Sequence, residues 1–94
     1  MAIAKNKQME ILDKSKDIER RLLLKYKKMD NDLTFGGKVK YFQEKNQKNM
    51  FLINALWNTV QVRNYIAHKN DFEISLKEYS YFLDTYNYVI SYLK

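Results

Sequence analysis

The chain has 94 residues, of which 46% are hydrophobic and 30% charged, and its formal net charge is +6. This length suits one domain, and the composition is typical of a folded protein rather than a disordered one. With no cysteine and one histidine, disulfides, thiolate metal sites and multi-histidine metal sites are excluded. We therefore expect residues 1–94 to form a single domain that uses no metal and no other cofactor.

The distribution of apolar residues excludes a membrane span and gives no sign of a secretory leader. No apolar run approaches the roughly 20 residues that a membrane helix needs. Residues 1–8, MAIAKNKQ, lack the apolar centre of a signal peptide. We expect a cytoplasmic protein without membrane contact.

Glycine and proline are scarce, which argues against an all-β fold. The chain has no proline and two glycines, Gly36 and Gly37, whereas a β domain of this size needs many turns. Residues that favour turns gather at 30–32, 46–49 and 69–71. These breaks leave four helical segments, and the sequence predicts an all-α, antiparallel up-and-down four-helix bundle with one short helix.

The first two segments have clear apolar stripes. In residues 4–28 the spacing of the apolar side chains follows the helical period of 3.6 residues for Ile11, Ile18, Leu22, Tyr26 and Met29. In residues 35–45 a second stripe follows Thr34, a residue suited to cap a helix, and consists of Phe35, Val39 and Phe42. The two adjacent glycines each cost about 1 kcal/mol in a helix, which predicts a frayed or 3₁₀ start.

The last two segments complete the predicted core. In residues 49–68 the side of the helix that is expected to face inward consists of Ile53, Leu56, Trp57, Val60 and Ala67. The fourth segment opens with Ser75-x-x-Glu78, a capping box. Its expected seam is Leu76, Tyr79, Leu83, Tyr86, Ile90 and Leu93, with Phe82 and Val89 beside it.

Three tyrosines of the last segment lie off this seam: Tyr81, Tyr88 and Tyr92. They could pack between two copies of the chain or stack on nucleic-acid bases. The enrichment of tyrosine at protein interfaces favours the first of these interpretations.

The positive charge is confined to one half of the chain. Residues 1–48 hold 13 basic and 7 acidic side chains, whereas residues 49–94 hold 4 of each. A basic helix beside a neutral bundle could contact phosphates without sequence preference. The alternative is a solvated lysine-rich face, which the interspersed acidic residues favour.

The third segment ends with the only histidine and the only arginine of the C-terminal half, Arg63 and His68. A guanidinium binds phosphate oxygens, and an imidazole exchanges protons near neutral pH. Together they could cleave RNA without a metal, with Asn64 orienting the reacting groups. A histidine near a helix end and an arginine on a helix also occur without any such role.

The spacing adds a geometric condition. Helix positions five residues apart are about 140° apart around the axis, so these two side chains do not share a face. A working site needs the helix to end or distort near His68, or a second copy of the motif supplied by a two-fold dimer.

The hexapeptide Arg63-Asn64-Tyr65-Ile66-Ala67-His68 resembles the R-x4-6-H signature of HEPN domains, in the common form R-N-x-I-A-H. Its place at the end of the third segment is also similar, as is a short second helix that opens with glycine. The resemblance extends over essentially the whole chain. It implies a helical bundle that dimerises and brings two motifs together.

Many HEPN proteins are metal-independent endoribonucleases of toxin–antitoxin and phage-defence systems, and they leave 2′,3′-cyclic phosphate ends. The resemblance implies that Arg63 contacts phosphate, that His68 is the general acid and base, and that Asn64 is the polar residue beside the arginine. HEPN toxins paired with nucleotidyltransferase antitoxins carry a tyrosine two residues after the histidine, where this chain has Asn70. Control by modification of such a tyrosine is therefore not expected.

The leading hypothesis is a homodimeric endoribonuclease that dimerises through its third helix and binds RNA in the cleft between the two copies. Lys69, Tyr65 and Arg21 are the expected RNA-contacting residues, and an antitoxin or regulatory protein is a possible partner. One alternative is a non-catalytic HEPN-like module for dimerisation or partner binding. Another is RNA binding through the first segment without chemistry, which steep loss of affinity with added salt would indicate.

Overall fold

The computed structural model describes residues 5–68 and 75–93, with the backbone alone for Lys5, Asn6 and His68. Its elements are α1 (Lys5–Lys25), α2 (Phe35–Lys45), α3 (Met50–His68) and α4 (Leu76–Tyr92). All four are helices that pack together, so the predicted all-α four-helix bundle with one short helix is confirmed. The short helix has the predicted bounds, and the first helix ends three residues earlier than expected.

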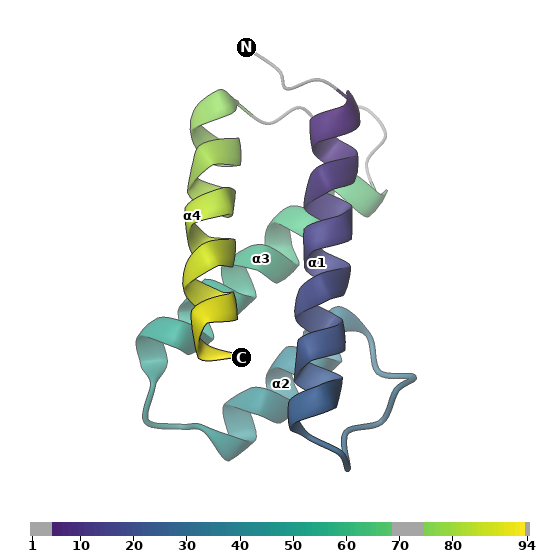
Figure 1. Ribbon diagram of the computed structural model, residues 1–94, viewed down its shortest axis with the longest axis vertical. Helices are drawn as coiled ribbons and strands as arrows, with labels where there is room; N and C mark the ends of the chain where they lie inside the picture. Colours follow the sequence, from purple (N-terminus) through teal and green to yellow (C-terminus); the bar gives the residue numbers. More distant parts are fainter. Residues whose placement is uncertain (1–4, 69–74, 94) are drawn as a thin grey trace.

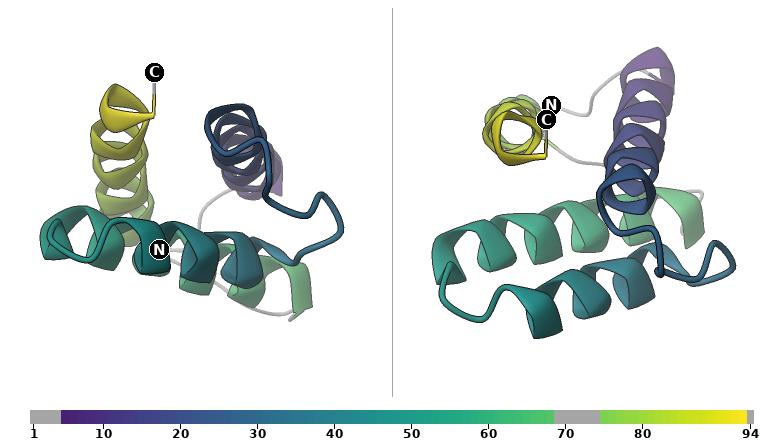
Figure 2. Two further views of the ribbon diagram at one scale, coloured as in Figure 1. Left: turned by 90° about the horizontal axis from the view of Figure 1, so that it is seen from below. Right: turned by 60° about the horizontal axis from the view of Figure 1, so that its bottom comes forward.

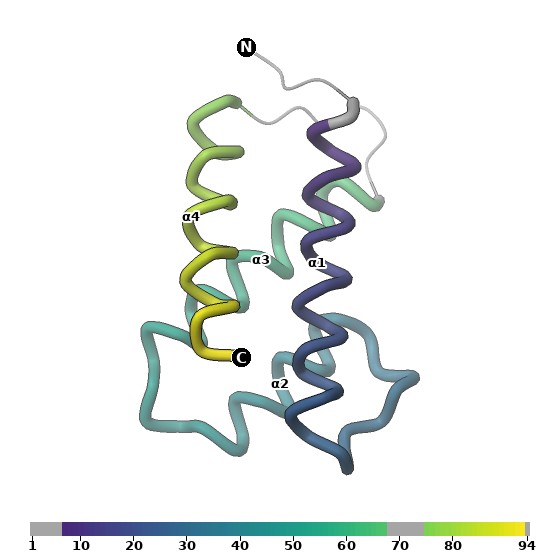
Figure 3. The backbone as a smooth tube through the Cα atoms, viewed as in Figure 1, coloured from purple at the N-terminus to yellow at the C-terminus, as the bar shows by residue number. Residues whose placement is uncertain are grey.

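The helices form two layers that cross each other. Helices α2 and α3 lie side by side and run in opposite directions, joined by the short turn before Met50 (Figure 2). Helices α1 and α4 lie across them, with α3 passing behind both in Figure 1. The continuous path of the chain through the four helices can be followed in Figure 3.

Helices α1 and α4 run in the same direction, and two polar contacts fix their register. The Tyr79 hydroxyl donates a hydrogen bond to Glu10, and seven residues further along both helices the Tyr86 hydroxyl donates to Asp17 at 2.6 Å. Each ring also lies beneath an ammonium group of α1, from Lys7 over the first and Lys14 over the second. This equal step of seven residues requires a parallel pair, which Figure 1 also shows. The antiparallel up-and-down arrangement predicted from the sequence is therefore wrong for α1 and α4, because these hydrogen bonds align the two helices in the same direction.

The core has a large cluster and a small one. The large cluster joins all four helices through buried side chains such as Leu22, Val39, Leu56 and Val89. The small cluster centres on two fully buried residues, Ile11 of α1 and Phe82 of α4. Half-buried side chains packed against this small cluster come from α3 and α4: Val62, Ile66, Tyr79, Leu83 and Tyr86.

Two helix starts show why the boundaries were predictable. The Thr34 hydroxyl accepts a hydrogen bond from the Gly37 backbone N–H, and the Lys38 N–H bonds to the Thr34 carbonyl at 2.9 Å in the α-helical pattern. The frayed or 3₁₀ start expected at the glycines is therefore wrong, because the cap satisfies the first turn. The predicted capping box of Ser75 and Glu78 is present, with both of its reciprocal hydrogen bonds.

The inward faces of the last two helices differ in detail from the sequence expectation. In α4 the most buried residues are Phe82, Thr85 and Val89, and the Leu76 side chain is 45% exposed. In α3 the predicted core residue Ala67 is exposed. The α4 difference has an identifiable cause: α1 contacts α4 along the line of its tyrosines, which turns Phe82 and Val89 toward the core.

Candidate functional site

The Arg63–His68 motif lies on the last turns of α3, where two apolar side chains fix its orientation. Val62 and Ile66 pack against the small cluster of Ile11 and Phe82. Helix positions next to these two point elsewhere, which accounts for the exposure of their described neighbours. Those of Asn64, Tyr65 and Ala67 are exposed, and that of Arg63 is half-buried.

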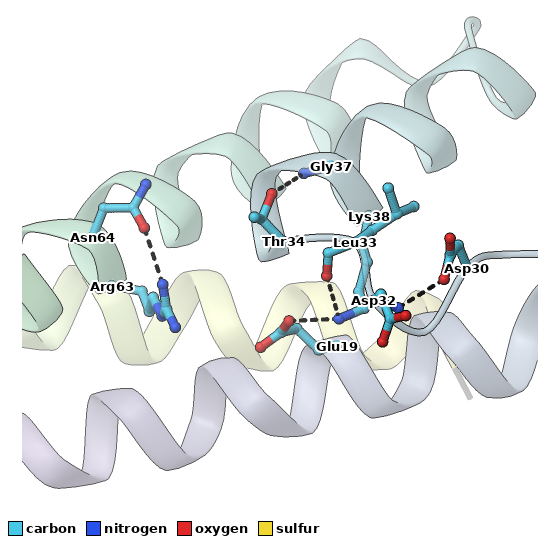
Figure 4. A network of polar contacts seen from close by, with 9 residues as sticks. All are labelled: Glu19, Asp30, Asp32, Leu33, Thr34, Gly37, Lys38, Arg63 and Asn64. Atoms are coloured by element: carbon cyan, nitrogen blue, oxygen red, sulfur yellow. Dashed lines mark hydrogen bonds and ion pairs between the residues drawn. The ribbon is translucent and has the colours of Figure 1, made fainter.

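The Arg63 guanidinium donates a hydrogen bond from Nη1 to Oδ1 of its neighbour Asn64 at 3.3 Å (Figure 4). The other two arginines of the chain, Arg20 and Arg21, both bind the Asp17 carboxylate. Among the described residues, Arg63 forms no ion pair. Within the described part of the chain, most of the N–H donors of its fork have no acceptor, and a phosphate group is a suitable one.

The histidine of the motif is the last residue of α3. The structure describes its backbone and not its side chain, and Lys69, an expected RNA-contacting residue, lies outside the described residues altogether. The helix continues as far as His68, so the backbone directions of Arg63 and His68 are about 140° apart around the axis. One protomer therefore directs the two residues to different sides of the same helix.

The expected RNA-contacting residue Arg21 is held by Asp17. Its Nε donates to Oδ2 of Asp17 at 2.9 Å, and Oδ1 accepts from Arg20 at 2.6 Å. Burial raises the pKa of Asp17, but hydrogen bonds from Tyr86, Arg21 and Arg20 outweigh it and hold the pKa at about 2. The same carboxylate raises the pKa of Arg21. Arg21 is thus part of the α1–α4 contact, on a different helix from the motif.

Tyr65, expected to line the cleft, is 45% exposed and neighbours Asn64 on α3. Its place beside the motif is compatible with contact to a ligand, and its role stays a prediction. Within residues 5–68 and 75–93, no three carboxylate, imidazole or thiol groups gather at one point. No helix in that part of the chain is both long and apolar enough to cross a lipid bilayer.

A hollow lies elsewhere, between α3 and α4, and we call it the α3–α4 groove. It has a volume of about 420 Å³ and is lined by Phe51, Asn54, Ala55, Asn58, Tyr81, Asp84, Thr85 and Tyr88. The rings of Phe51 and Tyr88 meet edge to face at 4.9 Å, and those of Tyr88 and Tyr92 lie 5.1 Å apart. Burial and the neighbouring Tyr92 raise the pKa of Tyr88.

Sequence reasoning did not single out this groove, although one signal for it was present. Phe51 lies 180° around the helix from Val60 and so cannot share the buried face. Its side chain is 71% exposed, the largest value among the exposed large hydrophobic residues. The side-chain oxygen Oδ1 of Asn58, a residue that lines the groove, is buried and has no hydrogen-bond partner within residues 5–68 and 75–93.

A buried ion pair near the first loop was also not foreseen. Lys38 is 5% exposed, and its Nζ lies 2.8 Å from Glu19 Oε1 and 2.9 Å from the Leu33 carbonyl oxygen (Figure 4). The pair ties α2 to α1 and to the loop between them. Its partners are 19 residues apart in sequence, so no short-range pattern indicates it.

Comparison with known proteins adds no further assignment. No protein-family model, curated protein or solved structure matches this chain.

Proposed function

We propose that this chain is a metal-independent endoribonuclease of the HEPN type, acting as a homodimer on cytoplasmic RNA in a toxin or phage-defence role. The observation that supports it is the contrast between Arg63 and the other two arginines. Arg20 and Arg21 share the Asp17 carboxylate, whereas Arg63 has no carboxylate partner among the described residues. It belongs to the segment that resembles the HEPN signature.

In the proposed reaction the RNA supplies its own nucleophile. The His68 imidazole takes the proton of a ribose 2′-hydroxyl, whose oxygen attacks the adjacent phosphorus. The P–O5′ bond breaks, and the leaving O5′ receives the proton from the His68 imidazolium, which returns to its neutral form. The products are a 2′,3′-cyclic phosphate and a 5′-hydroxyl end. Arg63 stabilises the charge that develops on the phosphoryl oxygens, and Asn64 holds the guanidinium through its side-chain oxygen.

The test is cleavage of RNA by the purified chain in the presence of EDTA, with His68→Ala and Arg63→Ala as the informative variants. The matched control is Arg20→Ala, which removes an equal charge from an exposed arginine of α1. We expect loss of at least 100-fold in rate for the first two, about the contribution of a general base or a charge-stabilising donor. The control should keep the wild-type rate. Cleavage that survives in both motif variants contradicts the proposal.

The α3–α4 groove favours a second candidate function, a non-catalytic module for dimerisation or for binding of a partner such as an antitoxin. Its exposed aromatic side chains are typical of an interface. This candidate predicts no RNA cleavage, no growth arrest on expression, and no effect of His68→Ala beyond stability. Growth arrest that depends on His68 would decide for the endoribonuclease.

A further inference from the structure

The α3–α4 groove is aromatic and almost uncharged on a strongly basic protein. Phe51 and Tyr81, which line it, are 71% and 59% exposed, and Tyr92, whose ring lies 5.1 Å from that of Tyr88, is 49% exposed. Asp84 is the one charged residue among those that line the groove. The centres of protein interfaces are enriched in phenylalanine and tyrosine and depleted in charge. Burying such side chains gains about 25 cal/mol per Å² of apolar surface. The groove therefore has the composition of a surface that another protein covers.

The charge distribution indicates which protein that is. All of the net charge of +6 belongs to residues 1–48, and residues 49–94 are neutral overall. Two copies of the chain repel each other through their basic halves, and this repulsion is weakest where α3 and α4 face one another. An acidic partner would instead be drawn to α1 and α2. A second copy is the partner that the neutral half fits best.

The groove is also complementary to itself, as a two-fold contact requires. It combines a protruding ring, that of Phe51, with a hollow of about 420 Å³ on the same surface.

We propose that the α3–α4 groove is the two-fold interface of a homodimer, with Phe51 of each copy seated in the groove of the other. The proposal adds an interface to the proposed function and rests on that function in one respect. In the dimer, α3 of one copy supplies the His68 that acts together with Arg63 of the other copy. The interface itself is measured without RNA. A failure of dimerisation and a failure of cleavage are therefore separate results.

The first experiment is analytical ultracentrifugation of the full chain, comparing wild type with Phe51→Glu. The matched control is Leu24→Glu, which changes a side chain of α1 that is 56% exposed. We expect a dimer for wild type and control, and at least about 30-fold weaker association for Phe51→Glu, the effect of losing one hot-spot residue. Far-UV circular dichroism should show all three equally helical. A monomeric wild type, or a Phe51→Glu variant that dimerises normally, overturns the proposal.

Salt gives an independent readout. Raising the ionic strength from about 0.05 to about 0.5 M screens the repulsion between the two basic halves, so dimerisation should become tighter. An interface held by charge pairs, or dimers bridged by contaminating nucleic acid, would weaken under the same change. Weaker association at high salt therefore contradicts a contact through the neutral groove.

A second experiment locates the contact. The chain has no cysteine, so a single thiol can be placed in the groove with Asn54→Cys or on exposed α1 with Lys16→Cys. We expect the groove thiol to react with a maleimide more slowly as protein concentration rises through the dissociation constant, and the α1 thiol to react at a constant rate. Concentration-independent reactivity at both positions overturns the assignment of the interface.

Discussion

At the scale of single residues, Asp17 links the acid sensitivity of the protein to the α1–α4 contact. Its pKa is about 2 in the folded chain, below the ordinary value of 3.8. Because folding lowers this pKa, the carboxylate stabilises the fold above about pH 4, and the stabilisation is lost as the pH falls toward 2. The shift corresponds to at most about 2 kcal/mol, since the side chain is 21% exposed.

We therefore expect Asp17→Asn to lower the free energy of unfolding by about 1–2 kcal/mol at pH 7 and by much less at pH 2. Urea titrations followed by circular dichroism at both pH values measure this. Asp13→Asn is the control, because it makes the same charge change at an exposed position of α1. A difference between Asp17→Asn and wild type that stays constant over this range would disagree with the role given to the carboxylate.

Gly36 offers a stabilising substitution at a residue that the fold does not require to be glycine. A β-carbon built there meets Trp57 at 3.7 Å and Val60 at 3.8 Å, both ordinary contacts, and the backbone is helical. Gly36→Ala should raise the free energy of unfolding by about 0.5–1 kcal/mol, since alanine loses less backbone freedom on folding. At Gly37 the added carbon meets Thr34 Oγ1 at 3.3 Å, so Gly37→Ala should gain less. Equal gains would mean that helix propensity alone decides both sites.

At the scale of elements, the Lys38–Glu19 pair decides how α2 is attached to α1. Removing one partner leaves the other charge buried without compensation, which typically costs about 3–5 kcal/mol. Lys38→Met should therefore destabilise the chain by about 3 kcal/mol, while Lys40→Met, at an exposed position of the same helix, should change little. The double variant Lys38→Met/Glu19→Met should recover at least half of the loss, because no charge is left unpaired. A double variant as unstable as the sum of the two single variants would show that the pair is not coupled.

Local features of these elements could be predicted, and contacts between distant elements could not. The Thr34 cap and the Ser75–Glu78 capping box act within three residues, and the stripe of Phe35, Val39 and Phe42 follows from helical periodicity alone. By contrast, the register of α1 and α4 depends on two hydrogen bonds between residues 69 apart. Those bonds orient α4 so that Phe82 and Val89 face the core. The periodicity of a single helix does not specify this rotation.

The candidate site shows the same division. The adjacency of Arg63 and Asn64 follows from the sequence, as does their position near the end of α3. The binding of both Arg20 and Arg21 to Asp17 depends on the fold. This binding distinguishes them from Arg63, which has no carboxylate partner among the described residues. The position of Phe51 off the buried face of α3 follows from helical spacing, whereas the groove that it lines together with α4 depends on the fold.

At the scale of the whole molecule, the position of Arg63 and His68 on one helix predicts that each active site combines residues from two protomers. Arg63→Ala and His68→Ala are each expected to be inactive. In a mixed dimer, however, one of the two sites receives the intact arginine from one chain and the intact histidine from the other. Random mixing makes half of the dimers mixed, so about a quarter of the wild-type activity should return. RNA cleavage in EDTA, assayed after the two variants are unfolded and refolded together, measures this recovery. Two variants that stay inactive after mixing, while ultracentrifugation shows that they dimerise, would place both residues of each site in a single protomer.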